Sequence, residues 1–196
     1  MLYHNYLEML LGSKVKVKIL RALHRHSGKE FTVRELADFI GVSHTGVHKA
    51  LDDLYGMNAV RIRVIGRSHT VAFNVESYAG GLVDVMFRME DETLSELVKL
   101  IRNKLSDPNI ASTLIFGSIA RGEEEPLSDI DLFILTKNKE DAEVAISELQ
   151  REVSNRFGNA ISPYMLSEED LADEDKIQIL KEIREKHIVV RGKPLW

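Results

Sequence analysis

The chain of 196 residues contains no cysteine, so it can form neither a disulfide bond nor a metal site built on thiolates. No apolar run approaches the roughly 18 or more residues that span a membrane. The N-terminus has no basic leader of the kind that opens a secretion signal. These absences are compatible with a reducing compartment, and we expect a cytoplasmic protein without membrane contact.

The composition that remains is 44% hydrophobic and 29% charged, which predicts a soluble globular protein of one large or two small domains. The net charge of −5 conceals an asymmetry. Residues 1–80 carry 11 Lys and Arg against 7 Asp and Glu, a balance of +4, and six of the seven histidines. Residues 81–196 carry 15 against 24, a balance of −9. A basic half joined to an acidic half indicates two domains, with any nucleic-acid contact in the first.

The first third of the chain shows helical periodicity in three segments, each with its own start signal. Ser13 is expected to cap a helix that runs to about residue 26, and Thr32 with Glu35 forms a capping box for the second helix. Ser43 caps the third, and the whole predicts a helix-turn-helix. The polar residues at the exposed start of the third helix, which we expect to meet DNA bases, are His44, Thr45, His48 and Lys49.

Two alternating strands follow the helices and are joined by a turn that contains Arg67 and His69. A helix, a helix-turn-helix and a hairpin in this order resemble a winged-helix domain, over about residues 13–76. In such a domain the hairpin is the wing. The resemblance therefore places Arg67 and His69 close to DNA phosphate or the minor groove.

Several observations leave the role of this first domain open. Winged helices also bind proteins, and Asp52 and Asp53 would repel phosphate if they lay in the groove. The spacing of His44 and His48 suits a metal ion, although no third ligand is evident nearby. The leucines of residues 1–11 need an apolar partner, which a second subunit could supply, so we expect a homodimer.

The chemistry of the chain is concentrated in the stretch TLIFGSIARGEEEPLSDIDLFIL, between Thr113 and Leu135. A hydrophobic strand ends in Gly117 and Ser118, where a strand turns into a short helix and backbone N–H groups favour a phosphate. Asp129 and Asp131 are two residues apart, so in a strand they point to one face. Paired carboxylates of this kind suit Mg²⁺ or Mn²⁺. One end of the stretch thus predicts phosphate binding and the other a divalent cation.

The pattern G-S-x-x-R-G, followed after five residues by S-D-x-D-L, resembles the signature of the nucleotidyltransferase superfamily that includes DNA polymerase beta. It is most similar to the small minimal-nucleotidyltransferase type. The resemblance implies that Gly117 and Ser118 cradle a nucleoside triphosphate. It implies also that Asp129 and Asp131 are catalytic and hold the metal ions.

Two further motif residues, Arg121 and Ser128, are assigned by the same resemblance. Arg121 would set the charge near the phosphates, and Ser128 would orient the turn. For Arg121 an ion pair with one of the acids at 123–125 is the alternative. Members of the superfamily that are active also carry a third carboxylate on the neighbouring strand, which here is expected at residues 159–165 and contains no acid.

The predicted fold class is a two-domain α/β (α+β) protein. A winged helix-turn-helix would be followed by a nucleotidyltransferase fold, in which helices flank a small mixed sheet. The stretch Tyr78-Ala79-Gly80-Gly81 is expected to mark the domain boundary, and a helix from about Leu82 to Leu105 is expected to follow it, with a break near Glu90. The expected domains are a winged helix-turn-helix DNA-binding domain at residues 1–78, a linker helix at 79–108 and a nucleotidyltransferase-like domain at 109–196. The expected elements of the last are strands at 112–116, 130–136, 160–166 and 187–190 and helices at 139–157 and 173–186.

Three functions stay open at this point. In the first, the chain is a DNA-binding transcriptional regulator with a nucleotide- and Mg²⁺-binding domain. Alternatively, it is an active enzyme that moves a nucleoside monophosphate from a triphosphate to a protein or small-molecule hydroxyl. In the third, both modules serve only as interaction domains. The sequence specifies neither the base, the acceptor nor the DNA site, and the missing third carboxylate leaves turnover open.

Overall fold

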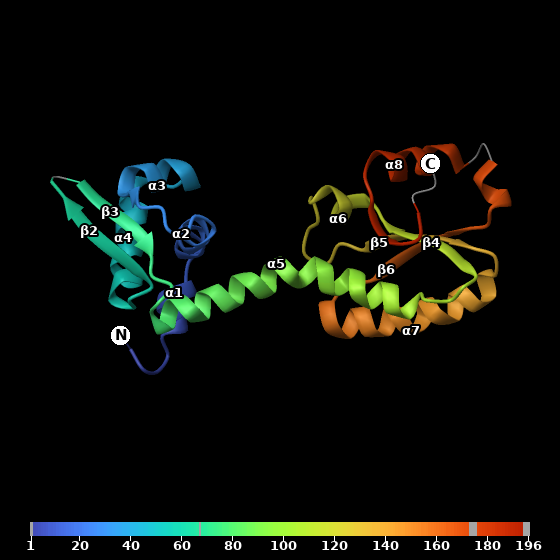
Figure 1. Cartoon of the computed structure of the whole chain (residues 1–196), viewed down its shortest axis with the longest axis horizontal. Helices are drawn as coiled ribbons and strands as arrows, with labels where there is room; N and C mark the ends of the chain where they lie inside the picture. Colours follow the sequence, from blue (N-terminus) through green and yellow to red (C-terminus); the bar gives the residue numbers. More distant parts are fainter. Residues whose placement is uncertain (1, 67, 173–175, 194–196) are drawn as a thin grey trace. The chain divides into compact units, whose positions relative to one another are not determined.

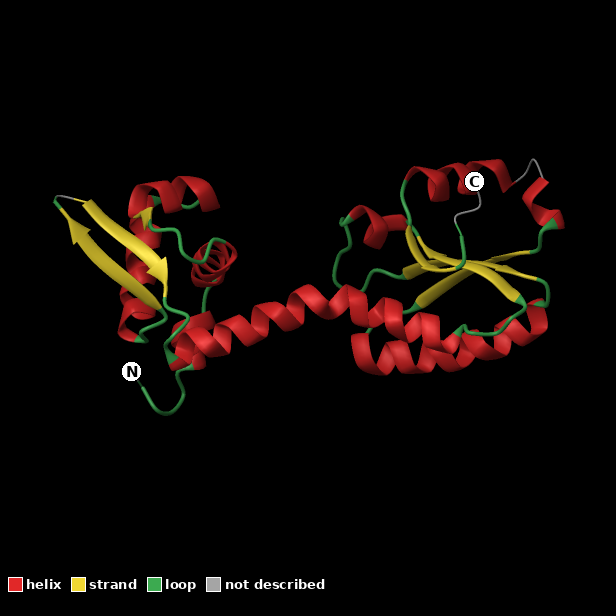
Figure 2. Cartoon of the chain, in the orientation of Figure 1, coloured by secondary structure: helices red, strands yellow, loops and turns green. Residues whose placement is uncertain are grey.

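The computed structural model describes residues 2–66, 68–172 and 176–193 (Figures 1 and 2). Contacts divide the chain into an N-terminal unit, Met1–Glu92, and a C-terminal unit, Thr93–Trp196. Helix α5, Tyr78–Lys104, contributes its first half to one unit and its second half to the other. The division predicted from the sequence, with residues 79–108 as a separate linker, stays a prediction.

The N-terminal unit is a winged helix-turn-helix, as the order of its elements predicts. Its helices are α1 (Leu7–Leu11), α2 (Lys14–Arg25), α3 (Val33–Ile40), α4 (His44–Gly56) and the first half of α5, and its strands are β1 (Phe31–Thr32), β2 (Val60–Ile65) and β3 (Ser68–Phe73). The three strands form an antiparallel sheet in the order β1-β3-β2. Helices α3 and α4 are the helix-turn-helix, and β2 with β3 is the wing.

The start signals in the sequence act as predicted. The hydroxyl of Ser13 accepts a hydrogen bond from Lys16 N at 3.2 Å, which begins α2. Thr32 and Glu35 form the capping box of α3, because each side chain accepts a bond from the other residue's backbone N–H. Ser43 caps α4, because its hydroxyl accepts a hydrogen bond from Gly46 N at 3.2 Å. The orientation of α4 is therefore set by local chemistry that the sequence displays.

The leucines near the N-terminus find most of their partners inside the same unit. Leu10 is fully buried in the core of the N-terminal unit, with Met9 and Leu11 packed against that core. The expectation that these residues need a second subunit is wrong for Leu10, because helix α1 folds back onto α2 and α4. Leu2 and Leu7 are the members of the group that stay about half exposed.

Helix α5 begins earlier than expected and runs without a break. Gly80 lies in its first turn, where an added Cβ would stand only 1.9 Å from the carbonyl oxygen of Asn74. The glycine is thus required by close packing and does not end an element. Glu90, where a break was expected, instead forms an ion pair with Arg21 of α2. Asp84, one and a half turns earlier, bonds His24 Nε2 at 2.9 Å, so two contacts hold α5 against α2.

The C-terminal unit is a four-stranded mixed sheet with helices on both faces (Figures 1 and 2). Its strands are β4 (Ile110–Ile115), β5 (Ile130–Thr136), β6 (Ile161–Leu166) and β7 (Ile188–Arg191), and its helical elements are the second half of α5, α6 (Gly117–Arg121), α7 (Lys139–Phe157), η1 (Glu169–Ala172) and α8 (Ile177–Glu185). The sheet order is β6-β5-β4-β7, with β5 and β6 parallel and the other pairs antiparallel. Helix α8 is shorter than the segment 173–186 expected from the sequence, and residues 173–175 lie outside the described residues.

Alternating side chains of β5 divide between two cores. Leu132 and Ile134 pack with α7 and the second half of α5 on one face of the sheet. Phe133 and Leu135 pack with α8 on the other face. Because alternate residues of a strand share a face, Asp131 points to the α8 side. The carboxylate of Asp131 therefore belongs to the face that α8 covers.

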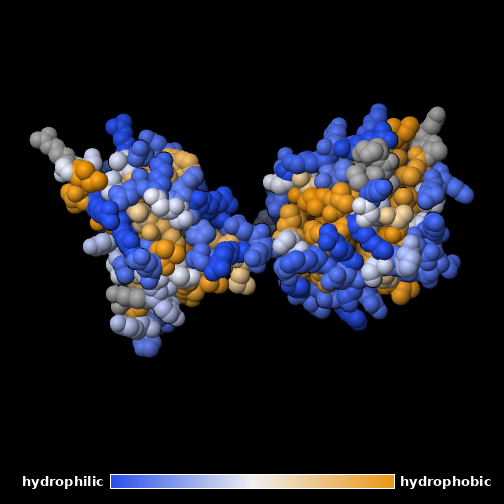
Figure 3. All heavy atoms as spheres, viewed as in Figure 1, coloured by the Kyte–Doolittle hydropathy of each residue, from blue (hydrophilic) through white to orange (hydrophobic). Residues whose placement is uncertain are grey.

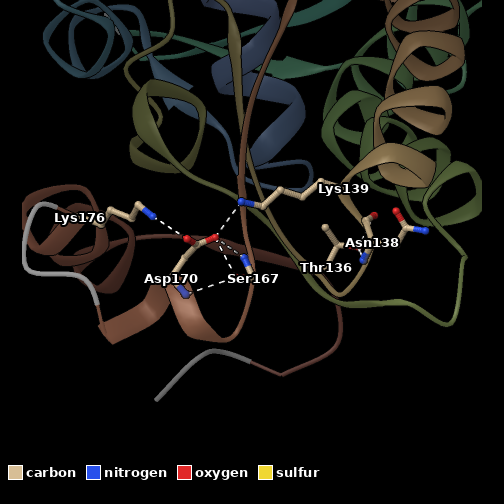
Figure 4. A network of polar contacts seen from close by, with 6 residues as sticks. All are labelled: Thr136, Asn138, Lys139, Ser167, Asp170 and Lys176. Atoms are coloured by element: carbon tan, nitrogen blue, oxygen red, sulfur yellow. Dashed lines mark hydrogen bonds and ion pairs between the residues drawn. The ribbon is translucent and has the colours of Figure 1, made fainter.

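A network around Asp170 ties the segment after β6 to the start of α7 (Figure 4). The Asp170 carboxylate accepts bonds from Lys139 at 2.8 Å, from Lys176 at 2.8 Å, and from both the backbone N–H and the hydroxyl of Ser167. Ser167 accepts in return from Asp170 N, so it caps η1 as its position predicts. Hydrogen bonds from Lys139 and Lys176 hold the pKa of Asp170 far below its ordinary range.

The Asp170→Asn variant is expected to unfold at a lower temperature than the wild type near pH 7. A carboxyl with a lowered pKa contributes stability above the pKa that it has in the unfolded chain, about 3.9, and loses that contribution as the pH falls further. The difference in melting temperature should therefore persist from about pH 8 to 5 and narrow below about pH 4. Thermal scans across this range measure it, with Glu169→Gln as the control for the loss of a neighbouring charge. A difference that is unchanged at pH 3 would contradict the electrostatic origin.

The described part of the chain has no helix with both the length and the apolar character that crossing a membrane requires.

Candidate functional site

Gly117 and Asp131 bring the two ends of the motif into contact. Phe116 N donates to the carbonyl oxygen of Asp131 at 3.0 Å, which holds the end of β4 beside the start of β5. Gly117 follows with a φ of +69°, and a Cβ there would stand 2.0 Å from Oδ2 of Asp131. The position excludes every side chain on two grounds, conformation and space. The turn that the sequence predicts to bind phosphate and the carboxylate that it predicts to bind a cation thus lie directly against each other.

The short helix α6 and the loop after it are held by local hydrogen bonds. Phe116 at the N-cap supplies no side-chain bond, so the backbone N–H groups at the start of α6 are not capped by it. Ser128 Oγ accepts from Glu125 N at 2.9 Å, and its carbonyl oxygen accepts from Asn159 Nδ2 at 2.9 Å. These bonds hold the turn before Asp129, and the role that the sequence predicts for Ser128 stays a prediction.

Asp129 and Asp131 differ in exposure although they are only two residues apart in the sequence. Asp129 is exposed, and Asp131 is partly buried. Burial raises the pKa of Asp131, the nearby charges of Glu182 and Asp129 raise it further, and Arg121 opposes them. The ionised form of Asp131 is therefore disfavoured relative to the protonated form, and a bound cation would stabilise the ionised form.

Arg121 donates to two carboxylates. Its Nε lies 3.0 Å from Glu123 Oε2, and one terminal nitrogen lies 3.0 Å from Glu182 Oε1. The ion-pair alternative for Arg121 thus occurs, with Glu123 as one of its expected partners. The Arg121 side chain is 41% exposed, and ion pairs of such exposure contribute little to stability because solvent screens them. A triphosphate can compete with them, so the pairs are compatible with a role near phosphate.

The strand beside Asp131 offers no carboxylate. In the parallel register of β5 and β6, Asp131 pairs with Ser162. The acid near Asp131 that the sequence did not reveal is Glu182 of α8, about fifty residues away. No local pattern marks it. The signal lies in the topology, because β7 pairs with β4 and brings the end of α8 to the same edge of the sheet.

The chemistry of these donors fits a hard divalent cation. Carboxylate oxygens are the ligands that Mg²⁺ prefers, and this ion usually takes one or two carboxylates together with substrate phosphates. Among the described residues, no three His, Cys, Asp or Glu side chains converge to hold a metal ion. Asp129 and Asp131 would therefore hold a cation together with the phosphates of a nucleotide.

The predicted DNA-binding residues lie around one hollow of the N-terminal unit. Its lining residues are Thr32, Val33, Arg34, His44, His48, Ser68 and His69. Thr45 and Lys49 are exposed on the same helix as His44 and His48. The structure thus brings His44 and His48 of α4 beside His69 of the wing, whereas Arg67 lies outside the described residues.

Three observations refine this surface. Asp53 forms an ion pair with Lys16 of α2 at 2.5 Å, which offsets one of the charges expected to repel phosphate. The rings of His44 and His48 lie 4.6 Å apart, edge to face. The wing also carries Val64 and Ile65, which are 67% and 60% exposed, and apolar atoms are visible beside the hairpin tip in Figure 3. The tip is therefore apolar as well as polar.

Comparison with protein families gives the decisive observation. The family model described as polymerase beta, nucleotidyltransferase matches residues 96–193, which is half of the chain and includes the whole motif. The chain belongs to the polymerase beta nucleotidyltransferase family. The fold of the C-terminal unit and the resemblance noted in the sequence are thereby confirmed.

A curated relative of this chain comes from Methanocaldococcus jannaschii, and its name assigns it provisionally to the protein adenylyltransferases. It is 30% identical over 89 residues, which cover 43% of the present chain and 60% of the relative. The chain thus spans less than two thirds of that protein.

Several solved structures are similar to parts of this chain. A toxin–antitoxin with AMP-PNP is 19% identical at a TM-score of 0.38, over 52% of this chain and 74% of that one. HlyU from Vibrio cholerae is 18% identical at a TM-score of 0.37, over 43% and 87% of the two chains. NolR from Sinorhizobium fredii is 22% identical at a TM-score of 0.33, over 41% and 79%.

Proposed function

We propose that this nucleotidyltransferase moves a nucleoside monophosphate from a nucleoside triphosphate to a hydroxyl group of a protein. The contact between Asp131 and Gly117 carries the proposal, because it puts the cation-binding carboxylate against the turn expected to bind phosphate. The relative named for protein adenylyl transfer supports ATP as the donor and a protein as the acceptor. A small-molecule hydroxyl is the alternative acceptor.

Each motif residue has a part in this reaction. The N–H groups at Gly117 and Ser118 bind the triphosphate, and Arg121 neutralises charge beside it. Asp129 and Asp131 hold a divalent cation such as Mg²⁺, which supplies electrostatic stabilisation of the triphosphate when bound. Ser128 fixes the loop that presents both acids. The substrate and the cation thus share the edge of the sheet where β4 ends and β5 begins.

The test is transfer of label from nucleoside triphosphate carrying ³²P at the α-phosphate to protein in a lysate of the source cells. Wild type with Mg²⁺ is expected to label protein, whereas the Asp129→Ala/Asp131→Ala variant is not. Label at the γ-phosphate serves as the control, because nucleotidyl transfer releases it as pyrophosphate. The absence of label that depends on the two aspartates would contradict the proposal.

A second candidate function is regulation of transcription through the N-terminal unit. The observation that favours it is the hollow between α4 and the wing, which gathers His44, His48 and His69 beside Arg34. The recognition helix of such a fold enters the major groove. In this proposal nucleotide with Mg²⁺ alters the affinity for DNA, and DNA alters the affinity for nucleotide by the same factor.

The variant His44→Ala/Lys49→Ala is expected to bind DNA more weakly by roughly 10-fold or more, since each lost base contact costs about 1–3 kcal/mol. Fluorescence anisotropy with the duplex upstream of the protein's own coding region measures this, with and without Mg²⁺ and nucleotide. Lys181→Ala, a charge removed from the C-terminal unit, is the control. Equal affinity of the wild type and the variant would remove α4 from the DNA interface. An affinity unaffected by nucleotide would remove the coupling.

We also propose a homodimer, in which the apolar residues left exposed near the N-terminus form the contact. Leu2, Tyr3, Tyr6 and Tyr78 line one hollow there, and Tyr3 and Tyr78 are 85% and 73% exposed. Two copies of a winged helix would present two α4 helices to successive half-sites of DNA.

A further inference from the structure

The position beside Asp131 on the neighbouring strand is held by a serine. Ser162 pairs with Asp131 in the parallel register, so the two side chains stand on one face of the sheet. That face is the one covered by α8, because Phe133 and Leu135 pack there with Leu180 and Ile183. Any carboxylate that serves this site from outside the strands therefore has to come from α8 or the loops around it.

The C-terminal end of α8 lies over the site. Strand β7, which follows α8 almost directly, pairs Ile188 with Ile115, two residues before Gly117. Lys186 Nζ lies 3.3 Å from the carbonyl oxygen of Arg121. Glu182 Oε1 lies 3.0 Å from the Arg121 guanidinium, and the Glu182 carboxylate is one of three charged neighbours of Asp131. Glu182 thus contacts Arg121 of the phosphate helix and lies close enough to Asp131 for their charges to interact.

The setting of Glu182 suits a group that acts on a substrate. Leu180 and Ile183 are buried beneath it, so the helix that carries it is anchored to the sheet. Its own side chain is 49% exposed, which leaves the carboxylate accessible to an incoming acceptor. Arg121 orients it through a hydrogen bond. The acids at 123–125, by contrast, lie on a loop, where a fixed geometry is harder to maintain.

We infer that Glu182 is the proton acceptor of the transfer reaction, supplied by helix α8 in place of a carboxylate on strand β6. The inference rests on the proposed function. The acceptor hydroxyl oxygen forms a bond to the α-phosphorus, the bond from that phosphorus to the bridging oxygen breaks, and pyrophosphate leaves. The hydroxyl proton passes to the Glu182 carboxylate and then to water. No oxidant or further reactant is needed.

Three variants test this assignment. Glu182→Gln retains the shape and a hydrogen-bonding oxygen for Arg121 but is a far weaker base. Glu185→Gln removes another exposed carboxylate from the same helix and is the matched control. Ser162→Asp, combined with Glu182→Gln, restores a carboxylate on the face of Asp131. Each variant is measured for transfer of ³²P from the α-phosphate of ATP to lysate protein, between pH 5 and 9, and for thermal stabilisation by ATP with Mg²⁺.

Glu182→Gln is expected to keep the ATP-dependent stabilisation and to lose transfer by about 10²–10⁴-fold, the range for general bases. Glu185→Gln should match the wild type, and Ser162→Asp should restore part of the rate. Transfer within about threefold of the wild type would overturn the assignment. If Glu182→Gln loses both the stabilisation by ATP and the transfer activity, the assignment is overturned as well, because Glu182 would then only position Arg121.

Failure of the proposed function gives a different result. If the wild type itself transfers no label, both the function and the role of Glu182 are overturned. If the wild type labels protein and Glu182→Gln does so equally well, the function stands and only the assignment of Glu182 fails. The thermal measurement reports on nucleotide binding in each case and does not depend on turnover.

Discussion

The Asp129→Ala/Asp131→Ala variant is expected to lose all Mg²⁺-dependent stabilisation by nucleoside triphosphate. A ligand at about 100 times its dissociation constant stabilises the folded state by about 2.7 kcal/mol, and the wild type should show a shift of this size with its preferred nucleotide. Both carboxylates are needed, because the described residues bring no third ligand to a cation. Thermal scans with ATP, GTP, CTP and UTP, each with and without Mg²⁺, measure the loss and identify the base.

The control for this variant is Glu124→Ala/Glu125→Ala, which removes two charges from the adjacent exposed loop. It should retain the shift. Without nucleotide, the aspartate variant should be at least as stable as the wild type near neutral pH. A carboxyl whose pKa is raised by folding destabilises the fold once it ionises, and Asp131 has such a pKa because of burial and the nearby charge of Glu182. If the aspartate variant without nucleotide unfolds at a lower temperature than the wild type, the predicted direction of this stability change is wrong.

Gly117→Ala is expected to damage both the fold and nucleotide binding. At φ = +69° an alanine is strained, and its Cβ would stand 2.0 Å from Oδ2 of Asp131. Left-handed strain alone costs about 1–2 kcal/mol, and displacement of Asp131 from the turn adds to it. The substitution therefore moves the carboxylate that binds the cation. Chemical denaturation measures the stability, and the Mg²⁺-dependent thermal shift measures binding.

Gly122→Ala separates the two causes. Gly122 has φ = +71°, but nothing lies within 4 Å of a Cβ built there. It should show the loss of stability from strain and keep nucleotide binding, whereas Gly117→Ala loses both. If the two variants bind nucleotide equally, the close approach of Asp131 to Gly117 does not contribute to nucleotide binding.

Local chemistry made most of the fold predictable. The capping box at Thr32 and Glu35, the cap at Ser43 and the alternating wing strands specify the winged helix from neighbouring residues alone. The motif between Gly117 and Asp131 likewise specifies a strand, a turn and a strand whose ends meet. These features depend on spacings of a few residues, which a sequence displays directly.

The features that the sequence did not reveal depend on contacts between distant segments. Gly80 resembles a break until the carbonyl of Asn74 is seen against it. Leu10 resembles an unpaired surface leucine until α1 is folded onto its own unit. Glu182 has no motif around it and approaches Asp131 only because β7 pairs with β4. In each case tertiary packing assigns a role that local propensity does not.

The contact between Gly117 and the Asp131 carboxylate has an evolutionary consequence. Any side chain at position 117 displaces the acid, so selection acts on the two positions as a pair and not on each alone. A lineage that keeps catalysis must keep both residues. A lineage that has abandoned it loses the spatial constraint at both together, since shortening the residue at 131 frees the space at 117 and leaves only the strain of the positive φ. Paired divergence at these positions would therefore mark the descendants that retain the fold after the chemistry has gone.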